Sequence, residues 1–424
     1  MHDARVLRDQ IESLRSAMQR RGKLEALAPL IDRGAALDVE RRTTIQAVEE
    51  RKAARNASSQ EVSRRKRAGE DAAPLITLGR ELGEEIQRLE GELARIEEEL
   101  GEILLGLPNV TLDDVPAGGE EANRVEKTWG EPRPSEGVKP HWEIGEALGI
   151  LDLPRGAKIS GSGFIVFRGL GARLTRALMN FFLDVHVREH AYEEVWVPVV
   201  VNRASMIGTS QLPKFEDDMY ALRDEDLFLV PTAEVPVTNL HRDEVLDGAS
   251  LPRGLTAYTP CFRREAGAAG KDTRGLLRVH EFDKVEIVRY CRPEQGPEEH
   301  ERLTRHAEIL LERLGLPYRR VLLAAGDTGF GSAKTWDLEA WAPGVGKWLE
   351  VSSCSTFTDF QARRANIRFR PGPGEKPQFV HTLNGSGLAF PRVIACLLES
   401  YQQPDGTVTV PDVLRPYLGV DTLS

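Results

Sequence analysis

The chain has 424 residues, of which 41% are hydrophobic and 29% are charged, and its formal net charge at pH 7 is −10. This length accommodates two or three domains, and the composition is typical of a globular protein with long solvated helices, which excludes a disordered chain. The net negative charge argues against indiscriminate nucleic-acid binding, although a local basic patch can still bind a phosphate backbone.

The N-terminal segment and the cysteines indicate where the protein works. The opening segment, "MHDARVLRDQIESLRSAMQRRG", is charged every few positions, and no later run reaches the roughly 18 apolar residues of a membrane span. The four cysteines lie far apart without a C-x-x-C pair, which disfavours a disulfide scaffold and a cysteine zinc site. We therefore expect a cytoplasmic protein that is neither secreted nor membrane-embedded, and we expect no zinc.

A helical hairpin is predicted in the N-terminal region. From Leu78 to Ile103 apolar residues recur at steps of three and four, which is the pattern of a coiled-coil seam. The stretch from Leu37 to Arg67 is also helix-compatible, and "AGEDAAP" separates the two. At about 1.5 Å per residue each helix would reach roughly 45 Å, which is too long and thin for a compact core, so we expect a projecting arm.

Charge distinguishes the two predicted helices. Residues 40–67 carry nine Arg or Lys against four Glu, whereas residues 70–102 carry eleven acids against three Arg. Pairing between oppositely charged helices explains this pattern without any ligand. The cluster "RRKR" at 64–67 fits that explanation poorly, because four consecutive helical residues point all round the axis and some must face solvent.

The pattern changes after the linker "LLGLPNVTLDDVPAGGEE", where short strands such as "EEVWVPVVV" and "KVEIVRY" alternate with helices such as "ARLTRALMNFFLDVHVREH". Strands joined by hairpin loops favour a mostly antiparallel sheet flanked by helices, which is an α+β fold. We assign residues 1–112 to the arm and residues 113–424 to a second domain. The sequence has neither a P-loop nor a strand-linked G-x-G-x-x-G, so any nucleotide is bound in another way.

The stretch "YTPCFRREAGAAGKDTRGLLRVHEFDKVEI" is predicted as a strand, a basic loop and a returning strand. Strand alternation would put Arg263 and Glu265 on one face and Arg264 on the other. A guanidinium can bridge a carboxylate and a phosphate, Arg278 can reach a terminal phosphate, and the ring of Phe282 can stack on a base. A surface ladder of alternating charges explains the hairpin equally well.

Three further stretches favour the ligand-binding interpretation. "LVPTAEVPVTNLH" places Thr232 and Glu234 after a buried apolar run. "KWLEVSSCSTFTDFQARR" places Glu350 near two serines, and such hard oxygen donors suit Mg²⁺. "VHTLNGSGLAFPRVIACLLESYQ" ends a strand in a glycine turn before a helix that carries Arg392, where a cation and the helix dipole together favour an anion.

Together these motifs resemble those of bacterial-type seryl-tRNA synthetases, which are class II aminoacyl-tRNA synthetases. "RALMNFFLDVHVREHAYEEVWVPVVV" is similar to the first class signature, "CFRREAG…RVHEFDKVE" to the second and "NGSGLAFPR" to the third. "PTAEVPVTNLH", "EVSSCS", "DFQARR" and "HTLNGSGLA" resemble family-specific stretches, and the hairpin resembles the arm with which the family grips tRNA. The resemblance implies that ATP and L-serine form seryl-adenylate and that serine passes to the 3′ end of tRNA(Ser), with tRNA(Sec) as a second candidate.

The resemblance also implies residue roles, with ATP as a substrate and Mg²⁺ as a cofactor. Arg263 and Arg392 would be catalytic. The implied serine-binding residues are Thr232, Ala233, Glu234, Arg263, Glu286, Asn384 and Ser386. The implied ATP-binding residues are Arg263, Arg264, Glu265, Arg278, Val279, Phe282, Glu350, Val351, Ser352, Ser353 and Arg392, with Glu350 and Ser353 as ligands of Mg²⁺. The implied tRNA-binding residues are Arg51, Arg55, Arg64, Arg65, Lys66 and Arg67.

The third signature departs from the family pattern, because Phe390 and Pro391 stand where a glycine usually precedes the arginine. Proline is tolerated in a first helical turn, so we expect the helix to start just before Pro391.

Two other functions stay open: a paralogue that loads an amino acid on a carrier protein, which usually lacks the arm, and a non-catalytic regulator. The first signature would otherwise be an exposed apolar helix and strand, which predicts a homodimer.

Overall fold

The structure is a computed structural model that describes residues 1–266 and 274–424. It divides into two compact units, Met1–Pro108 and Asn109–Ser424, which are described separately below. The predicted basic loop extends over residues 267–273, which lie outside the described residues.

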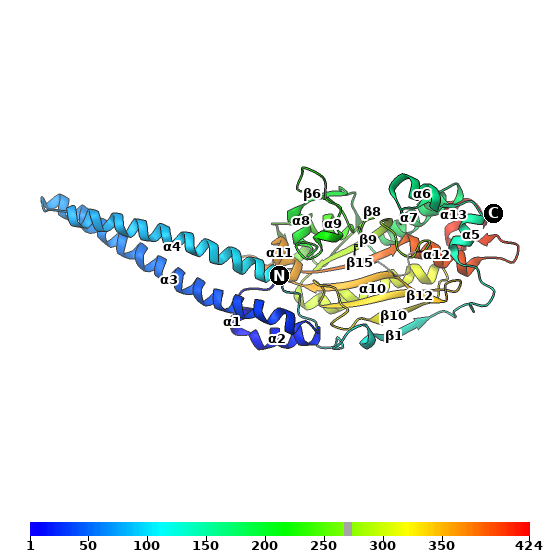
Figure 1. Cartoon of the computed structure of the whole chain (residues 1–424), viewed down its shortest axis with the longest axis horizontal. Helices are drawn as coiled ribbons and strands as arrows, with labels where there is room; N and C mark the ends of the chain where they lie inside the picture. The colour runs from blue at the N-terminus through cyan, green and yellow to red at the C-terminus, as the bar shows by residue number, and fades with distance from the viewer. Residues whose placement is uncertain (267–273) are drawn as a thin grey trace. The chain divides into compact units, whose positions relative to one another are not determined.

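The first unit is the predicted helical hairpin, and Figure 1 shows its two long helices side by side. Its helices are α1 (Val6–Asp9), α2 (Ile11–Arg20), α3 (Leu24–Ala68) and α4 (Ala73–Gly106). Helix α3 begins earlier than the sequence predicted and is capped after Ala68 by Gly69, whose φ of +73° favours a residue without a Cβ. The hairpin prediction is confirmed, and the "AGEDAAP" stretch connects the two helices.

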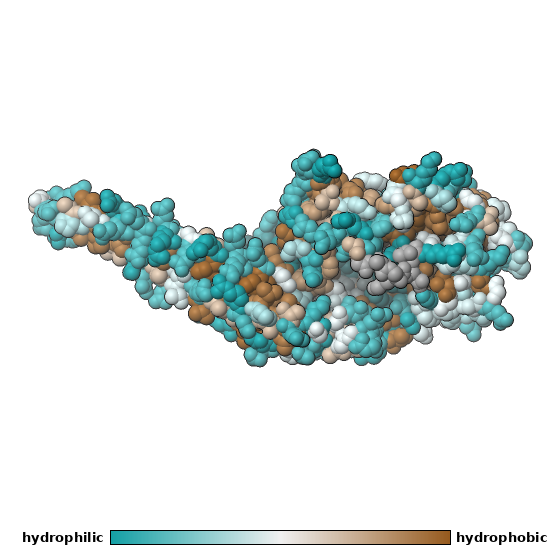
Figure 2. Space-filling view, viewed as in Figure 1, coloured by the Kyte–Doolittle hydropathy of each residue, from teal (hydrophilic) through white to brown (hydrophobic). Residues whose placement is uncertain are grey.

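The seam of the hairpin is buried along only part of its length. Ile86, Leu89, Ile96, Leu100 and Ile103 of α4 are buried against α3. Leu78 also fits the predicted seam, but its side chain is 43% exposed. The tip of the hairpin is therefore more loosely packed than its base, and Figure 2 shows a largely hydrophilic surface there.

The second unit is built on an eight-stranded sheet in the order β1-β10-β11-β12-β15-β9-β8-β4. The strands are β1 (Arg124–Trp129), β10 (Tyr318–Leu322), β11 (Lys334–Ala342), β12 (Lys347–Thr358), β15 (His381–Ala389), β9 (Glu281–Cys291), β8 (Arg253–Phe262) and β4 (Glu193–Glu194). Every neighbouring pair is antiparallel except β4 and β8. The mostly antiparallel α+β fold predicted from the sequence is confirmed.

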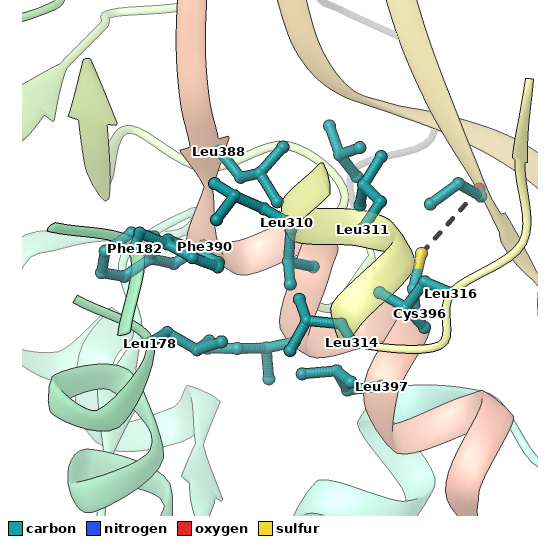
Figure 3. Close-up of a cluster of buried hydrophobic side chains, with 14 of the residues drawn as sticks. Leu178, Phe182, Leu310, Leu311, Leu314, Leu316, Leu388, Phe390, Cys396 and Leu397 are labelled. Carbon is teal, nitrogen blue, oxygen red and sulfur yellow. Dashed lines mark hydrogen bonds between the residues drawn. The ribbon is translucent and has the colours of Figure 1, made fainter. Parts of the chain in front are cut away.

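Helices cover both faces of this sheet. On one face α7 (Leu170–Arg188), α10 (Gly296–Arg313) and α12 (Phe390–Tyr401) form the main core, and Figure 3 shows Leu178 and Phe182 facing Leu310, Leu314 and Leu397. On the other face α9 (Glu234–Asn239) and α11 (Phe360–Ala365) pack against β8 and β9.

Strand β9 shows how the sheet separates the core from a polar site. Its odd-numbered residues Val285 and Ile287 belong to the main core, whereas Val288 and Tyr290 belong to the core on the other face. Because side chains alternate along a strand, Lys284 and Glu286 share the face of Val288 and Tyr290. The strand thereby carries two charged side chains into a pocket beside the second core.

The remaining elements are short. The helices are α5 (His141–Ala147), α6 (Leu153–Ser160), α8 (Arg203–Gly208) and α13 (Arg415–Leu418). The strands are β2 (Leu151–Asp152), β3 (Val166–Phe167), β5 (Val200–Asn202), β6 (Leu227–Leu229), β7 (Val245–Asp247), β13 (Arg368–Arg370), β14 (Gln378–Phe379), β16 (Val408–Thr409) and β17 (Thr422–Leu423). Among the described residues, no helix is long and apolar enough to cross a membrane.

The prediction of one continuous strand in "EEVWVPVVV" is wrong. Only Glu193–Glu194 and Val200–Asn202 are strands, and Pro198 lies between them. Proline has no N–H to donate to a sheet ladder, so the strand pairing does not continue through it.

Candidate active site

Three adjoining cavities lie over the strands β12, β15, β9 and β8. The arginine cavity, of about 250 Å³, is lined by Arg263, Arg278 and Arg392. The acid cavity, of about 230 Å³, is lined by Glu234, Glu286 and Glu350. The outer cavity, of about 390 Å³, lies between Arg263, Arg278 and the segment 211–219. Arg263 lines all three cavities and stands where they meet.

The three arginines of the arginine cavity are half-buried. The Arg263 guanidinium lies 5.1 Å from the centre of the Phe282 ring, and its Nε donates to the carbonyl of Pro231 at 3.3 Å. Arg392 donates to the carbonyl of Glu350 at 2.8 Å, and Arg278 pairs with the Glu265 carboxylate. Guanidinium groups that converge on one cavity beside an aromatic ring can hold several phosphates and a base. Val279 and Val351 also line this cavity.

The argument from strand alternation for residues 263–265 is wrong. Strand β8 ends at Phe262, and Glu265 has a φ of +51°. Arg263 and Glu265 nevertheless line the same two cavities, because the chain turns after the strand. Arg264 is exposed and lines none of the three cavities, and its backbone N–H donates to the carbonyl of Asp218 at 2.9 Å.

The acid cavity holds a buried network of charged groups. The Lys284 ammonium donates to the Thr232 hydroxyl at 2.7 Å and to the Glu286 carboxylate at 2.7 Å. The Thr232 hydroxyl donates to Glu286 at 3.3 Å, and Gln361 donates to Glu234 at 2.6 Å. Two acids, one hydroxyl and one lysine in a small pocket suit a small ligand that carries an ammonium group.

Burial controls the protonation of the two acids. Burial and then the negative charge of Glu286 raise the pKa of Glu234 to about 7. Burial raises the pKa of Glu286 above its ordinary value, although Lys284 counteracts the shift. Perturbed carboxyl groups in a pocket are typical of functional sites.

Two residues of this network were missed by the sequence reasoning. Lys284 lies in "DKVE" at the end of the second class signature, and its place two positions before Glu286 on a strand could have indicated that both face the cavity. Gln361 lies in "DFQARR", and it also accepts from the Thr382 hydroxyl at 2.8 Å. Gln361 comes from α11, so no local pattern in the sequence links it to Glu234.

The other serine-pocket candidates lie on neighbouring elements. Asn384 and Ser386 line the acid cavity from β15, where Ser386 is opposite Glu286 in the strand register. Ala233 is fully buried before α9 and lines none of the three cavities. Its carbonyl accepts from the backbone N–H of Val237 at 3.0 Å.

Glu350 and Ser353 both line the acid cavity although they are three residues apart on β12. A register shift between Leu338 and Glu339 on β11 explains this, because Glu339 pairs with Glu350 and Leu338 with Ser352. On a regular strand, side chains three residues apart point to opposite faces of the sheet. The bulge at Val351 brings Glu350 and Ser353 to the same face. A carboxylate and a hydroxyl are hard oxygen donors, so the pair fits Mg²⁺.

Ser352 and Asp337 complete the description of this wall. Ser352 is buried, lines none of the three cavities, and donates to the carbonyl of Ser386 at 2.7 Å. Asp337 is opposite Ser353 in the register, and burial together with the charge of Glu350 raises the pKa of Asp337. No group of three or more His, Cys, Asp or Glu suited to a metal occurs within residues 1–266 and 274–424.

The helix of the third signature starts where the sequence predicted. Helix α12 begins at Phe390, so Pro391 lies in its first turn and removes no hydrogen bond. Arg392 follows in the same turn, and its Nε donates to the carbonyl of Leu277 at 3.1 Å.

The cations of the first unit fall into two groups. Near the middle of the hairpin, Arg51 pairs with Glu85 at 2.9 Å and Lys52 pairs with Glu90 at 3.0 Å, as charge pairing between the helices predicts. At the tip, the "RRKR" cluster lies in the last turns of α3. Arg64 pairs with Glu61 of the same helix at 2.6 Å, and its side chain stays 62% exposed. Arg55, Lys66 and Arg67 are exposed as well.

Comparisons with known proteins agree over the whole chain. Residues 1–111 match the family model described as "Seryl-tRNA synthetase N-terminal domain", and residues 214–401 match "tRNA synthetase class II core domain (G, H, P, S and T)". The serine--tRNA ligase of Gemmatimonas aurantiaca is 64% identical over 99% of both chains, and that of Geobacillus kaustophilus is 55% identical over 99% of both. The seryl-tRNA synthetase of Pyrococcus horikoshii, solved with ATP, is 39% identical, superposes with a TM-score of 0.94 and is matched over 99% of its length.

Proposed function

This chain belongs to the seryl-tRNA synthetase family, and from that premise we propose that it activates L-serine with ATP and transfers serine to the 3′ end of tRNA(Ser). Arg263 carries the proposal, because it lines the arginine, acid and outer cavities at once. A cation at the point where the cavities meet can orient a carboxylate toward a phosphate and stabilise the charge that develops as they are joined.

In the first step the serine carboxylate attacks the α-phosphorus of ATP. A P–O bond to the α-phosphate forms, the bond to the β-phosphate breaks, and pyrophosphate leaves with the electron pair. Arg263 holds both reacting groups and neutralises the charge that develops on the α-phosphate oxygens. Arg278 and Arg392 bind the γ-phosphate, and the adenine lies against Phe282 and Val279 near Glu265.

Glu350 and Ser353 hold Mg²⁺, which supplies positive charge to the phosphates when bound. Arg392 also contacts the backbone of Glu350, so the two phosphate-binding groups are positioned together.

The acid cavity selects serine. Glu234 and Glu286 accept from the ammonium and hydroxyl groups of the substrate, with Thr232, Asn384 and Ser386 beside them. Alanine would leave a buried acceptor without a partner, which a hydrogen-bonding pocket rejects strongly.

In the second step a hydroxyl of the terminal tRNA ribose attacks the seryl carbonyl, and AMP leaves. The hairpin grips the tRNA, with Arg55 and the "RRKR" cluster as the phosphate contacts. Arg51 has a carboxylate partner within the hairpin and is the weakest member of the predicted set. The division into a tRNA-binding arm at residues 1–112 and a catalytic domain at 113–424 follows the same proposal.

The protein works as a cytoplasmic homodimer under this proposal, and the two alternative functions lose support. A carrier-protein paralogue would lack the arm, whereas residues 1–111 match the family's N-terminal domain. A non-catalytic regulator would have lost the phosphate-binding arginines, and all three line one cavity. Whether tRNA(Sec) is charged as well needs a separate assay with that tRNA.

The test is serine-dependent exchange of pyrophosphate into ATP, followed by charging of purified tRNA(Ser). Arg263→Ala should slow exchange by roughly 100- to 1000-fold or more, because it removes a contact that strengthens at the transition state. Arg264→Ala is the matched control, since Arg264 is exposed and lines none of the cavities. Near-normal exchange in Arg263→Ala would refute the assignment.

A further inference from the structure

A buried histidine and a buried glutamate join helix α5 to helix α12. His141 is the first residue of α5, Glu399 lies on α12, and both are fully buried. The His141 Nδ1 lies 2.7 Å from the Glu399 Oε1, and the backbone N–H of His141 donates to the same oxygen at 3.0 Å. Neither residue lines any of the three cavities, so the proposed reaction uses neither side chain directly.

The Glu399 carboxylate is held by donors on both of its oxygens. Its Oε2 accepts from the backbone N–H of Gly344 at 2.8 Å and from that of Val345 at 3.1 Å, in the turn between β11 and β12. Together with the two donors of His141, these contacts satisfy the buried carboxylate, which would be costly without them. His141 is therefore attached to a firmly held point of the fold.

The other ring nitrogen of His141 contacts the chain that leads into β9. The backbone N–H of Leu276 donates to the His141 Nε2 at 2.9 Å. A ring nitrogen that accepts a hydrogen bond carries no proton, so the ring proton lies on Nδ1 and is donated to Glu399. The carboxylate thus selects the tautomer that the contact with Leu276 requires.

A glycine allows this close approach. Gly275 has a φ of +64°, and a Cβ at this position would lie 2.4 Å from the His141 Nε2. The Arg274 guanidinium lies 4.7 Å from the centre of the Trp142 ring, and that ring meets the His141 ring edge-on. Glycine permits both the backbone conformation and the contact with the ring. Two consecutive residues of α5 therefore hold the chain at residues 274–276.

The chain held in this way continues into the wall of the arginine cavity. Residues 276–279 all line that cavity. Arg392 donates to the carbonyl of Leu277 at 3.1 Å. Arg278 lies two positions beyond the N–H that the His141 ring binds. A shift of that N–H would therefore move Arg278, to which the proposed function assigns the γ-phosphate.

We propose that His141 is a positioning residue for ATP: with its tautomer set by Glu399, it holds residues 274–278 so that Arg278 lines the arginine cavity before ATP binds. This inference rests on the proposed function and adds to it a residue that touches no substrate. A protein that populates its binding-competent conformation only in part binds its ligand more weakly in proportion. The effect is specific to ATP, because Arg278 does not line the acid cavity.

Two substitutions distinguish the two ring nitrogens of His141. His141→Asn keeps an amide near the position of Nδ1, but its side chain is too short to reach Leu276. His141→Gln brings an amide oxygen near the position of Nε2, where it can accept from Leu276. In pyrophosphate exchange, His141→Asn should raise the KM for ATP roughly 5- to 100-fold, because a buried N–H loses its partner. The KM for serine at saturating ATP should stay near that of wild type, and His141→Gln should restore the KM for ATP.

A double-mutant cycle tests whether His141 acts through Arg278. In an Arg278→Ala background, His141→Asn should raise the KM for ATP little further, because changes that act through one shared contact are not additive. If His141→Asn does not fold, Gly275→Ala replaces it, since the added Cβ displaces the same segment from the His141 ring.

Tyr401→Phe is the matched control for the loss of a hydrogen bond near α12. Tyr401 lies on the same helix as Glu399, its hydroxyl donates to the carbonyl of Leu314 at 2.7 Å, and it lines none of the three cavities. The variant should keep the wild-type KM for ATP.

The outcomes separate positioning from a purely structural role. A folded His141→Asn or Gly275→Ala with a lower melting temperature and an unchanged KM for ATP would overturn the proposal, because the contact would then only stabilise the fold. Equal increases in the KM values for ATP and serine, an additive cycle, or a His141→Gln that behaves like His141→Asn would overturn it as well. Absence of exchange in wild type would mean that the proposed function fails, whereas normal exchange with any of these results would mean that only the positioning assignment fails.

Discussion

We expect Glu234 to make serine binding depend on pH near neutrality. Its pKa is raised to about 7, so lowering the pH through 7 protonates a carboxylate that would otherwise attract the substrate ammonium. We expect the KM for serine to rise as the pH falls from 8 to 6, by at most about tenfold per pH unit below the pKa. Pyrophosphate exchange at saturating ATP measures this dependence.

Glu234→Gln provides the control for this prediction. The amide is neutral at every pH, so the variant should bind serine more weakly than wild type at pH 8 and show a flat profile between pH 8 and 6. A flat profile in wild type would contradict the assignment of Glu234 to the ammonium.

Lys284 is expected to stabilise the folded state through Glu286. Both side chains are buried, and Lys284→Met would leave Glu286 as a buried carboxylate without its ion pair. Breaking one partner of such a pair costs about 3–5 kcal/mol. Urea unfolding at pH 8 should show a loss of this order.

The direction in which the destabilisation of Lys284→Met changes with pH shows whether an unpaired Glu286 carboxylate or lost packing causes it. The folded-state pKa of Glu286 is raised even with Lys284 present, and it should rise further in Lys284→Met. A carboxyl group with a raised folded pKa destabilises the fold at high pH, and the cost disappears as the pH falls below its unfolded pKa. The destabilisation should therefore shrink between pH 8 and pH 5, and an equal loss at both would indicate lost packing alone.

Helix α3 carries two kinds of cationic side chain: those that pair with glutamates of α4, and those near its end that are candidates for binding tRNA. Neutralising Arg64, Arg65, Lys66 and Arg67 together should raise the KM for tRNA and leave serine activation unchanged, because these residues belong to the first unit and line none of the three cavities. The salt dependence of charging should flatten by about 0.7 to 0.9 logarithmic units per lost phosphate contact.

Matched cations on α4 serve as the comparison for this experiment. Arg80 and Arg88 are exposed, and each pairs with a glutamate one turn further along the same helix. Neutralising them removes positive charge from the acidic helix and should leave the salt slope of charging unchanged. Equal slopes for the tip variant and wild type would show that the cluster is only a solvated helix end.

The predicted homodimer can be tested by substitution of Trp196. This residue follows the short strand β4 at one edge of the sheet, and it is 81% exposed. An aromatic side chain so exposed is typical of an interface. Trp196→Asp should weaken self-association in sedimentation at micromolar concentration. Val125→Asp, on β1 at the opposite edge of the sheet, changes an exposed apolar residue in the same way and should leave the dimer intact. A wild-type protein that is an active monomer would overturn the prediction.

The sequence by itself determined the elements whose signals are local. The 3.5-residue repeat between Leu78 and Ile103 predicted α4, because the period of apolar residues in a helix is independent of the rest of the fold. The start of α12 beside Pro391 followed in the same way from the fixed φ of proline. The second class signature predicted the strand pair β8 and β9 and a cation at Arg263.

Only the tertiary structure decided which of these residues meet. The bulge at Val351 brings Glu350 and Ser353 to one cavity and turns Ser352 away, and strand alternation alone cannot predict a bulge. Gln361 reaches Glu234 from a helix far along the chain, and Phe215 lines a cavity together with Arg263 from the segment before β6. Such contacts depend on long-range packing of the sheet and its helices, which no short sequence window encodes, whereas helix periodicity and proline geometry are properties of the chain itself.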